Sequence, residues 1–103
     1  MSIEKKSIKK KGKNDVFKLK ELKIGGQLYK IKFVNADDIE HDCGECNRAT
    51  TTIKIRKDMS IGQTKETLIH EIIHAINSDL SELAVDAVAH GLYQVYKDNL
   101  DLV

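Results

Sequence analysis

One amphipathic stretch decides the fold and the chemistry of this chain, the run Thr64-Lys65-Glu66-Thr67-Leu68-Ile69-His70-Glu71-Ile72-Ile73-His74-Ala75-Ile76. Within it, His70-Glu71-Ile72-Ile73-His74 matches the His-Glu-x-x-His pattern, in which one helix carries two imidazoles and a carboxylate. Residues four apart share a helix face, so His70 and His74 can reach one metal ion while Glu71 addresses a water molecule beside it. The spacing predicts a zinc-dependent hydrolase.

Two helices are predicted in the C-terminal half of the chain. Ser60 is a suitable N-cap for the first, which we expect at 61–77 with an apolar stripe along one side. A short turn follows, in which Asp79 or Ser81 can cap a second helix at 82–98. Helices joined by so short a connection must pack antiparallel. The inward residues of the second helix are expected to be Leu83, Ala84, Ala87, Val88, Leu92 and Val95.

The N-terminal half contains the alternating apolar and polar residues of β-strands. Residues 16–24 and 28–34 predict a hairpin around Gly25-Gly26, and 44–47 and 51–56 predict two further strands. The expected fold class is α+β, with a small antiparallel sheet of three to four strands packed on the antiparallel helix pair. The strand at 51–56 is also expected to offer its edge to an extended peptide.

The metal site needs a third protein ligand, because a catalytic zinc usually has three and one water. The second helix offers Glu82, Asp86 and His90 on one face. Both helices rise by the same distance per residue, so residues at similar separations from the connecting turn lie at the same level. Glu82 is in this way level with His74. Asp86 is level with His70, where it can accept the far ring N–H of that histidine. We predict Glu82 as the third metal ligand and Asp86 as the carboxylate that supports His70. Asp86 or His90 is the alternative third ligand.

Length and charge bound the class of protein. The 103 residues fit one domain, which we place at 16–103 behind a basic tail at 1–15. Residues 1–32 hold 11 Lys and 3 acids, a charge of +8, whereas 33–103 hold 6 bases and 13 acids, a charge of −7. The tail has no apolar period, so we predict that it is disordered and either aids solubility or makes a weak contact with nucleic acid or an acidic partner.

Membrane insertion and secretion are not expected. No stretch approaches the roughly 18 apolar residues of a membrane span. The lysine-rich N-terminus lacks the apolar core of a signal peptide. We therefore predict a cytoplasmic protein.

The two cysteines form a single Cys-x-x-Cys, Cys43-Gly44-Glu45-Cys46. No second cysteine pair completes a four-ligand zinc site, and His41 is the one nearby histidine. Reduced cysteines of a cytosolic protein are commonly small apolar side chains, which is the expected role here. A second metal site at Cys43, Cys46 and His41 is the alternative.

Three segments resemble small phage-borne zincin-like proteins related to the ImmA/IrrE metallopeptidases. These segments are Thr67-Leu68-Ile69-His70-Glu71-Ile72-Ile73-His74-Ala75-Ile76, Glu82-Leu83-Ala84-Val85-Asp86 and Ala89-His90-Gly91-Leu92-Tyr93-Gln94-Val95. The similarity extends back through the Gly25-Gly26 turn and the 44–55 hairpin, and covers about residues 20–100. It implies a minimal zincin-like domain with zinc at His70, His74 and Glu82 and with Glu71 as the base.

The resemblance also has departures. Asn77 and Leu80 stand where the metzincin extension has its Gly and third His. Some ImmA/IrrE relatives cleave phage-type or stress-response repressors, but the chain lacks the additional C-terminal and DNA-binding portions of those larger members. A phage or host regulator is therefore the substrate that the resemblance implies, in a phage or bacterial host cell.

Three functions fit the sequence. The first is a zinc metalloendopeptidase that hydrolyses peptide bonds of a protein or peptide substrate. The alternative is a non-catalytic, zinc-stabilised module that binds protein or nucleic acid. A third reading treats the histidines as ordinary helix-surface residues. We favour the peptidase because the His-Glu-x-x-His pattern is complete and no phosphate cradle or Ser/His/Asp set competes with it.

Overall fold

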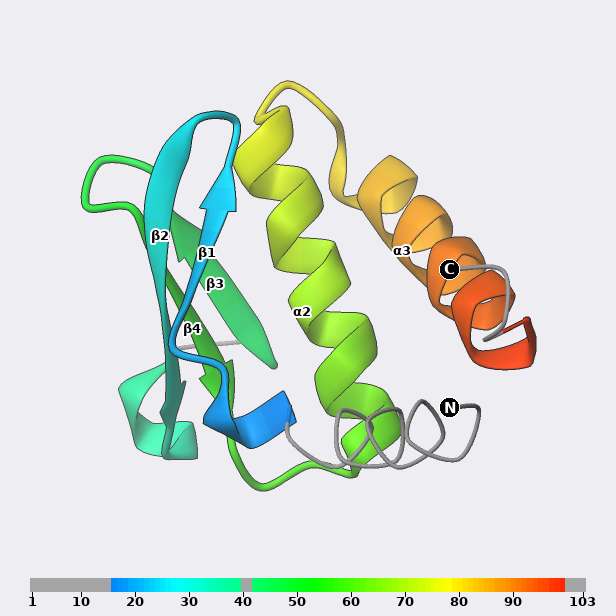
Figure 1. The fold of residues 1–103 in the computed structure, drawn as a ribbon, viewed down its shortest axis with the longest axis horizontal. Coiled ribbons are helices and arrows are strands. Elements are labelled where there is room, and N and C mark those ends of the chain that lie inside the picture. Colours follow the sequence, from blue (N-terminus) through cyan, green and yellow to red (C-terminus); the bar gives the residue numbers. More distant parts are fainter. Residues whose placement is uncertain (1–15, 40–41, 100–103) are drawn as a thin grey trace, which may run out of the picture.

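The computed structural model describes residues 16–39 and 42–99 and shows a sheet, a central helix and an outer helix (Figure 1). The predicted basic tail at 1–15, His41 and the last four residues of the predicted domain lie outside the described residues. The elements follow in the order η1 (Val16–Lys18), β1 (Glu21–Ile24), β2 (Gln27–Val34), η2 (Ala36–Asp38), β3 (Gly44–Asn47), β4 (Thr52–Arg56), α2 (Ile61–Ile76) and α3 (Glu82–Asp98).

The first two strands form the predicted hairpin. Gly25 and Gly26 have φ angles of 57° and 84°, in the left-handed region that suits glycine in a tight turn. The turn sets an antiparallel register in which Leu22 pairs with Tyr29. The first strand was expected to begin at residue 16, but β1 begins at Glu21. Val16–Lys18 forms a short 3-10 turn instead.

The four strands form one sheet in the order β1-β2-β4-β3. The expected α+β class, the four strands and the helix pair are confirmed, and the β1–β2 and β3–β4 pairings are antiparallel as expected. The central β2–β4 pairing is parallel, with Ile31 opposite Ile53 and Phe33 opposite Ile55. This mixed arrangement arises because the β3–β4 hairpin presents its second strand to β2.

The sheet order corrects one expectation about substrate binding. Residues 51–56 were expected to provide a free edge, but β4 is hydrogen-bonded to β2 on one side and to β3 on the other. The edge strands are β1 and β3, and among the described residues the one strand partner of β3 is β4.

The main core lies between the sheet and α2. Ile53 and Ile55 of β4 are fully buried, and Tyr29 and Ile31 of β2 lie beside them against Ala75 of α2. Alternate residues of both strands therefore point to one face, as the two-residue period requires. Burial of each large apolar side chain stabilises the fold by roughly 1.5–3 kcal/mol, so this face holds α2 in place.

A second core cluster joins the two helices. Ile73 of α2 meets Val85 and Ala89 of α3, with Ile69 packed beside them. As a result α2 is the middle layer, with the sheet on one side and α3 on the other, and α3 runs antiparallel to it as expected (Figure 1).

The buried face of α3 differs from the expected one. Val85 and Ala89 are the buried residues of this helix, whereas Leu83 is 80% exposed and Leu92 is 51% exposed. Ala87, Val88 and Val95 are exposed as well, so these five residues of the predicted inward set do not face the core. Apolar residues occupy more than one side of α3, and the small surface offered by α2 selects the side that carries Val85.

Both helices begin where the capping residues predict. The Ser60 hydroxyl accepts a hydrogen bond from the Gln63 N–H at 3.1 Å, and the Ser81 hydroxyl accepts one from the Ala84 N–H at 3.1 Å. Ser81, rather than Asp79, is thus the cap of α3. Among the described residues, no helix combines the length and apolar character that crossing a bilayer would require.

Candidate metal centre

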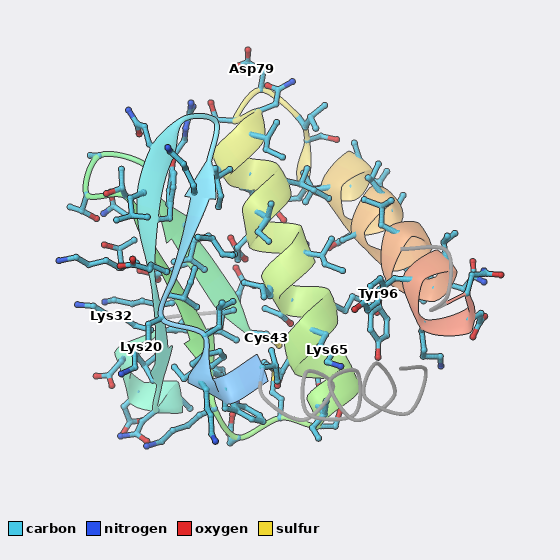
Figure 2. All side chains as sticks on the ribbon, viewed as in Figure 1. Lys20, Lys32, Cys43, Lys65, Asp79 and Tyr96 are labelled. Atoms are coloured by element: carbon cyan, nitrogen blue, oxygen red, sulfur yellow. The ribbon has the colours of Figure 1, made fainter. Side chains whose placement is uncertain are left out.

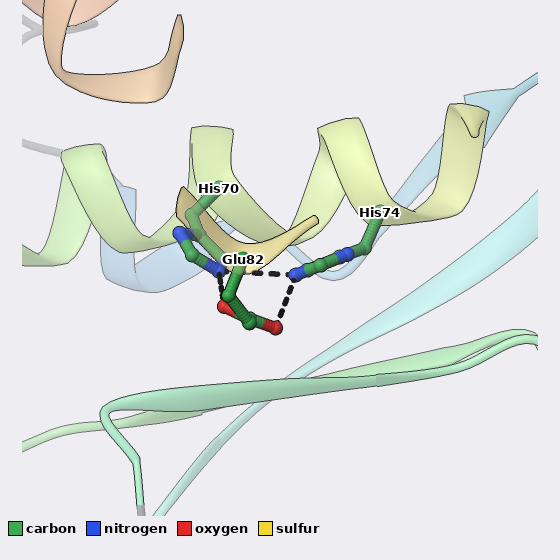
Figure 3. A group of neighbouring side chains, drawn as sticks. All are labelled: His70, His74 and Glu82. Atoms are coloured by element: carbon green, nitrogen blue, oxygen red, sulfur yellow. Dashed lines mark hydrogen bonds and ion pairs between the residues drawn. The ribbon is translucent and has the colours of Figure 1, made fainter. Parts of the chain in front are cut away.

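Two histidines of α2 converge on one point. His70 and His74 are one turn apart, both are half-buried, and their Nε2 atoms are 3.1 Å from one another (Figure 3). The ring centroids are 4.8 Å apart in an edge-to-face arrangement. The four-residue spacing in the sequence therefore gives the shared direction that a bidentate metal site needs.

Glu82, the first residue of α3, completes the group. Its Oε1 lies 3.2 Å from His70 Nε2 and its Oε2 lies 2.9 Å from His74 Nε2 (Figure 3). The Ser81 cap fixes where α3 begins and so fixes the level of Glu82 against α2. The structure thus brings together the three residues that the sequence predicts as ligands, although the Glu82 side chain is 73% exposed.

The three donors fit a zinc ion. Zn–N and Zn–O bonds of about 2.0–2.1 Å in a tetrahedron require donor atoms about 3.3 Å apart. The two Nε2 atoms are 3.1 Å apart, His70 Nε2 is 3.2 Å from one Glu82 oxygen and His74 Nε2 is 2.9 Å from the other, so a small outward movement of the side chains accommodates the ion. Two imidazoles and one carboxylate are also a donor set that catalytic zinc uses, with one position left for water.

Asp86 lies where the sequence places it, behind His70. Its Oδ1 is 2.9 Å from His70 Nδ1, so the Nδ1–H can donate to the carboxylate. That hydrogen bond leaves the Nε2 lone pair of His70 directed at the Glu82 carboxylate, which presents lone pairs as well. A cation between these atoms relieves the repulsion, and Asp86 fixes the ring that would bind it.

Glu71 is held inside the site beneath β3. The residue is 5% exposed, and its carboxylate has no hydrogen-bond or ion-pair partner among the described residues. No buried side-chain oxygen or nitrogen of the described residues lacks a hydrogen bond, so the Glu71 oxygens are the part of the residue that reaches the cleft. Burial, together with the negative charges of Glu82, Asp42, Glu45 and Asp86, raises the pKa of Glu71 to about 8. A carboxylate with a pKa near neutrality is suited to accept and return a proton.

Gly44 of β3 explains why Glu71 can lie so deep. A Cβ atom at this glycine would be 2.8 Å from Thr67 Cγ2, 3.1 Å from the Lys54 carbonyl oxygen and 3.2 Å from Glu71 Cγ. The strand therefore approaches α2 as closely as only glycine allows. The sequence signal of this close approach is a glycine within a predicted strand.

His90 is not part of the metal group. Its Nδ1 lies 3.3 Å from Glu66 Oε2, and its side chain is 76% exposed. Glu66 lies one turn before His70 on α2, and His90 lies one turn after Asp86 on α3, so this pair is about one turn away from the metal group. The geometry therefore leaves Glu82, and not His90, beside the two histidines.

The cysteines are free thiols on the far wall of the same cleft. Cys43 lies between the sheet and α2 (Figure 2), where its Sγ accepts a hydrogen bond from Gln63 Nε2 at 3.5 Å. Cys46 packs partly into the main core, and burial raises the pKa of its thiol to about 11. Within the described ranges neither thiol joins a group that can hold a metal, and His41 lies outside those ranges.

These groups line one open cleft of about 820 Å³ between β3, α2 and α3. Sequence reasoning missed several of its lining residues, because they come together from segments far apart in the chain. One example is Arg48, which donates a hydrogen bond to the Ser78 hydroxyl across the end of α2. Others that the sequence did not single out are Asp42, Gln63, Glu66 and Lys97.

Comparisons with protein-family models, with curated proteins and with solved structures found no match to this chain.

Proposed function

We propose that this protein is a zinc-dependent metalloendopeptidase. The observation that carries the proposal is the convergence of His70 Nε2, His74 Nε2 and the Glu82 carboxylate, with Glu71 buried beside them in an open cleft. Three ligands and a nearby carboxylate base are the parts that metal-assisted hydrolysis of an amide requires.

The chain's own residues divide the work of the reaction. His70, His74 and Glu82 would hold zinc, which when bound supplies Lewis-acid polarisation of the scissile carbonyl and activation of water. The Glu71 carboxylate takes a proton from the attacking water onto one oxygen and returns it to the leaving amine. Asp86 keeps the Nδ1 proton of His70 in place, so that Nε2 stays free to bind metal.

The position of β3 supports a peptide as the substrate. This edge strand forms one wall of the cleft, and residues from Asp42 to Cys46 line it. An extended peptide can add to such an edge through backbone hydrogen bonds, which would lay it along α2 past the metal group. The proposed substrate is a protein regulator of a phage or its bacterial host, and the proposed compartment is the cytoplasm, where the free thiols would stay reduced.

The buried carboxylate favours this function over a non-catalytic binding module. A closed structural zinc site gains nothing from Glu71, whose burial without a partner destabilises the ionised form. A peptidase gains its proton carrier from the same residue. The proposed contact of the lysine-rich tail with nucleic acid or an acidic partner remains a separate prediction, because the tail lies outside the described residues.

The test is Glu71→Gln in zinc-loaded protein. Wild type and variant are incubated with a peptide library, and cleavage is followed by mass spectrometry. We expect the variant to keep its zinc and to lose at least about 100-fold in cleavage rate, because the proton carrier is gone while the ligands remain. Equal cleavage by both proteins would contradict the proposal. Asp79→Asn, in the exposed connection between the helices, is the matched control and should cleave at the wild-type rate.

A further inference from the structure

The outer helix α3 has more apolar surface than α2 covers. Among the described residues, α2 is the one element that α3 packs against extensively (Figure 1). The covered side of α3 carries Val85 and Ala89. Beside it lie Val88, Leu92 and Val95, which are 46%, 51% and 42% exposed. The apolar part of α3 therefore extends well beyond the part that the fold buries, which indicates a further contact.

Val88, Leu92 and Val95 form one row along α3. They are four and three positions apart, so they lie on the same side of the helix. None of them lines the cleft, whereas Asp86 and Lys97 of the same helix do. The row is therefore apolar throughout and lies away from the metal group.

The helix α2 extends this surface. Ile69 packs beside Val85 and Ala89 where the two helices meet. Ile76 follows two turns later on the same side of α2 and is 63% exposed. Neither isoleucine lines the cleft. We define the helix-pair patch as the four exposed residues of this surface, which are Ile76, Val88, Leu92 and Val95.

The size of the helix-pair patch fits the centre of a dimer interface. From their exposed fractions, the four side chains leave on the order of 400 Å² of apolar surface open to water. A homodimer interface of ordinary size takes roughly 800 Å² from each partner, of which roughly 65% is apolar. The patch supplies most of that apolar area, and the polar residues around it can supply the rim.

The spacing of the row also makes it complementary to itself. Val88 and Val95 lie at nearly equal distances on either side of Leu92. When two α3 helices cross antiparallel about a two-fold axis near Leu92, each Val88 meets the Val95 of the other copy, and the two Leu92 side chains meet at the axis. The formal charge of +1 per chain opposes this association only weakly.

We propose that two copies of this chain form a dimer through their helix-pair patches, with the α3 helices packed antiparallel. The clefts lie away from this interface, so each copy keeps its own metal group accessible. The dimer does not depend on the peptidase function proposed above.

The first test is sedimentation velocity of the full chain over roughly 1–100 µM. We expect the protein to change from monomer to dimer across this range, with a Kd of roughly 10 µM. Monomer throughout would leave the patch to another occupant and would overturn the proposal. A species larger than a dimer would also overturn it, because a two-fold contact closes on itself.

A matched pair of substitutions locates the interface. Leu92→Arg and Leu83→Arg both replace an exposed leucine of α3, and Leu83 is 80% exposed and lies outside the patch. Leu92→Arg should weaken association at least about 100-fold, because two cations would meet at the axis. Leu83→Arg should leave the Kd unchanged. Far-UV circular dichroism and the urea midpoint check that both variants fold, and equal effects on the Kd would contradict the proposed interface.

Cysteine pairs test the direction of packing without disrupting the patch. In a background of Cys43→Ser with Cys46→Ser, proteins carrying Val88→Cys and Val95→Cys are mixed and oxidised. We expect the mixed disulfide to exceed both like-with-like disulfides, because an antiparallel pair separates the two copies of position 88 by roughly 10 Å along the helix axis. An excess of like-with-like disulfides would refute the antiparallel arrangement.

Discussion

At the scale of single residues, Asp86 determines how His70 presents its ring to a metal. The 2.9 Å contact from Asp86 Oδ1 to His70 Nδ1 favours the tautomer with a free Nε2. Asp86→Asn removes the negative charge. It also lets the side-chain amide turn either its oxygen or its NH2 group toward His70 Nδ1. We expect zinc affinity to fall about tenfold or more, measured by competition with a chromophoric chelator. Unchanged affinity would show that Asp86 does not orient the ligand.

Glu71 gives the metal-free protein a pH-dependent stability. Its pKa in the folded protein is about 8, raised from 4.5. Because ionisation is harder in the folded state, the stability of the fold is full below pH 4.5 and declines as pH rises toward 8. The burial and the facing charges of Glu82, Asp42, Glu45 and Asp86 cause this decline.

Glu71→Gln removes that titration. Urea unfolding of chelator-treated wild type and variant should show the variant gaining on the wild type between pH 5 and pH 8, by roughly 1.4 kcal/mol per pH unit of the interval at most. The difference between the two proteins cancels the contributions of the other titrating groups to the pH dependence of stability. A stability difference that is the same at both pH values would refute the proposed pKa.

At the scale of elements, the close approach of β3 to α2 builds the floor of the site. Gly44→Ala would push a methyl group against Thr67, the Lys54 carbonyl and the Glu71 side chain. We expect a loss of about 1–3 kcal/mol in the free energy of unfolding, from the urea midpoint. Gly91→Ala on α3 is the control, since nothing lies within 4 Å of its added Cβ and alanine favours a helix by roughly 0.5–1 kcal/mol. Equal effects would contradict the packing described here.

The elements themselves were largely predictable from local signals. Ser60 and Ser81 cap their helices through their own hydroxyls, and Gly25-Gly26 turns the first hairpin, so the information lies within a few residues. The parallel pairing of β2 with β4 was not predictable in this way, because it depends on which strand of a distant hairpin reaches β2. The exposed Leu83 was assigned inward for the same reason, since only the packed surface of α2 selects a face of α3.

At the scale of the whole molecule, three layers bring one cleft to the metal group. The order of sheet, α2 and α3 puts β3 and α3 on either side of the histidine-bearing helix (Figure 1). Counting helical levels was sufficient to predict that Glu82 and Asp86 lie beside His74 and His70, because a short connection fixes two antiparallel helices against one another. It could not reveal Asp42 or Arg48, whose places depend on the path of the loops around β3.

The central claim is that His70, His74 and Glu82 hold one zinc ion. The most direct measurement is the zinc content of the purified chain by metal mass spectrometry, for wild type, His74→Ala and Cys43→Ser with Cys46→Ser. We predict near one zinc per chain in the wild type and in the cysteine variant, and its loss in His74→Ala, because two protein ligands hold zinc far less tightly than three. No zinc in the wild type, or zinc retained in His74→Ala and lost from the cysteine variant, would contradict the account.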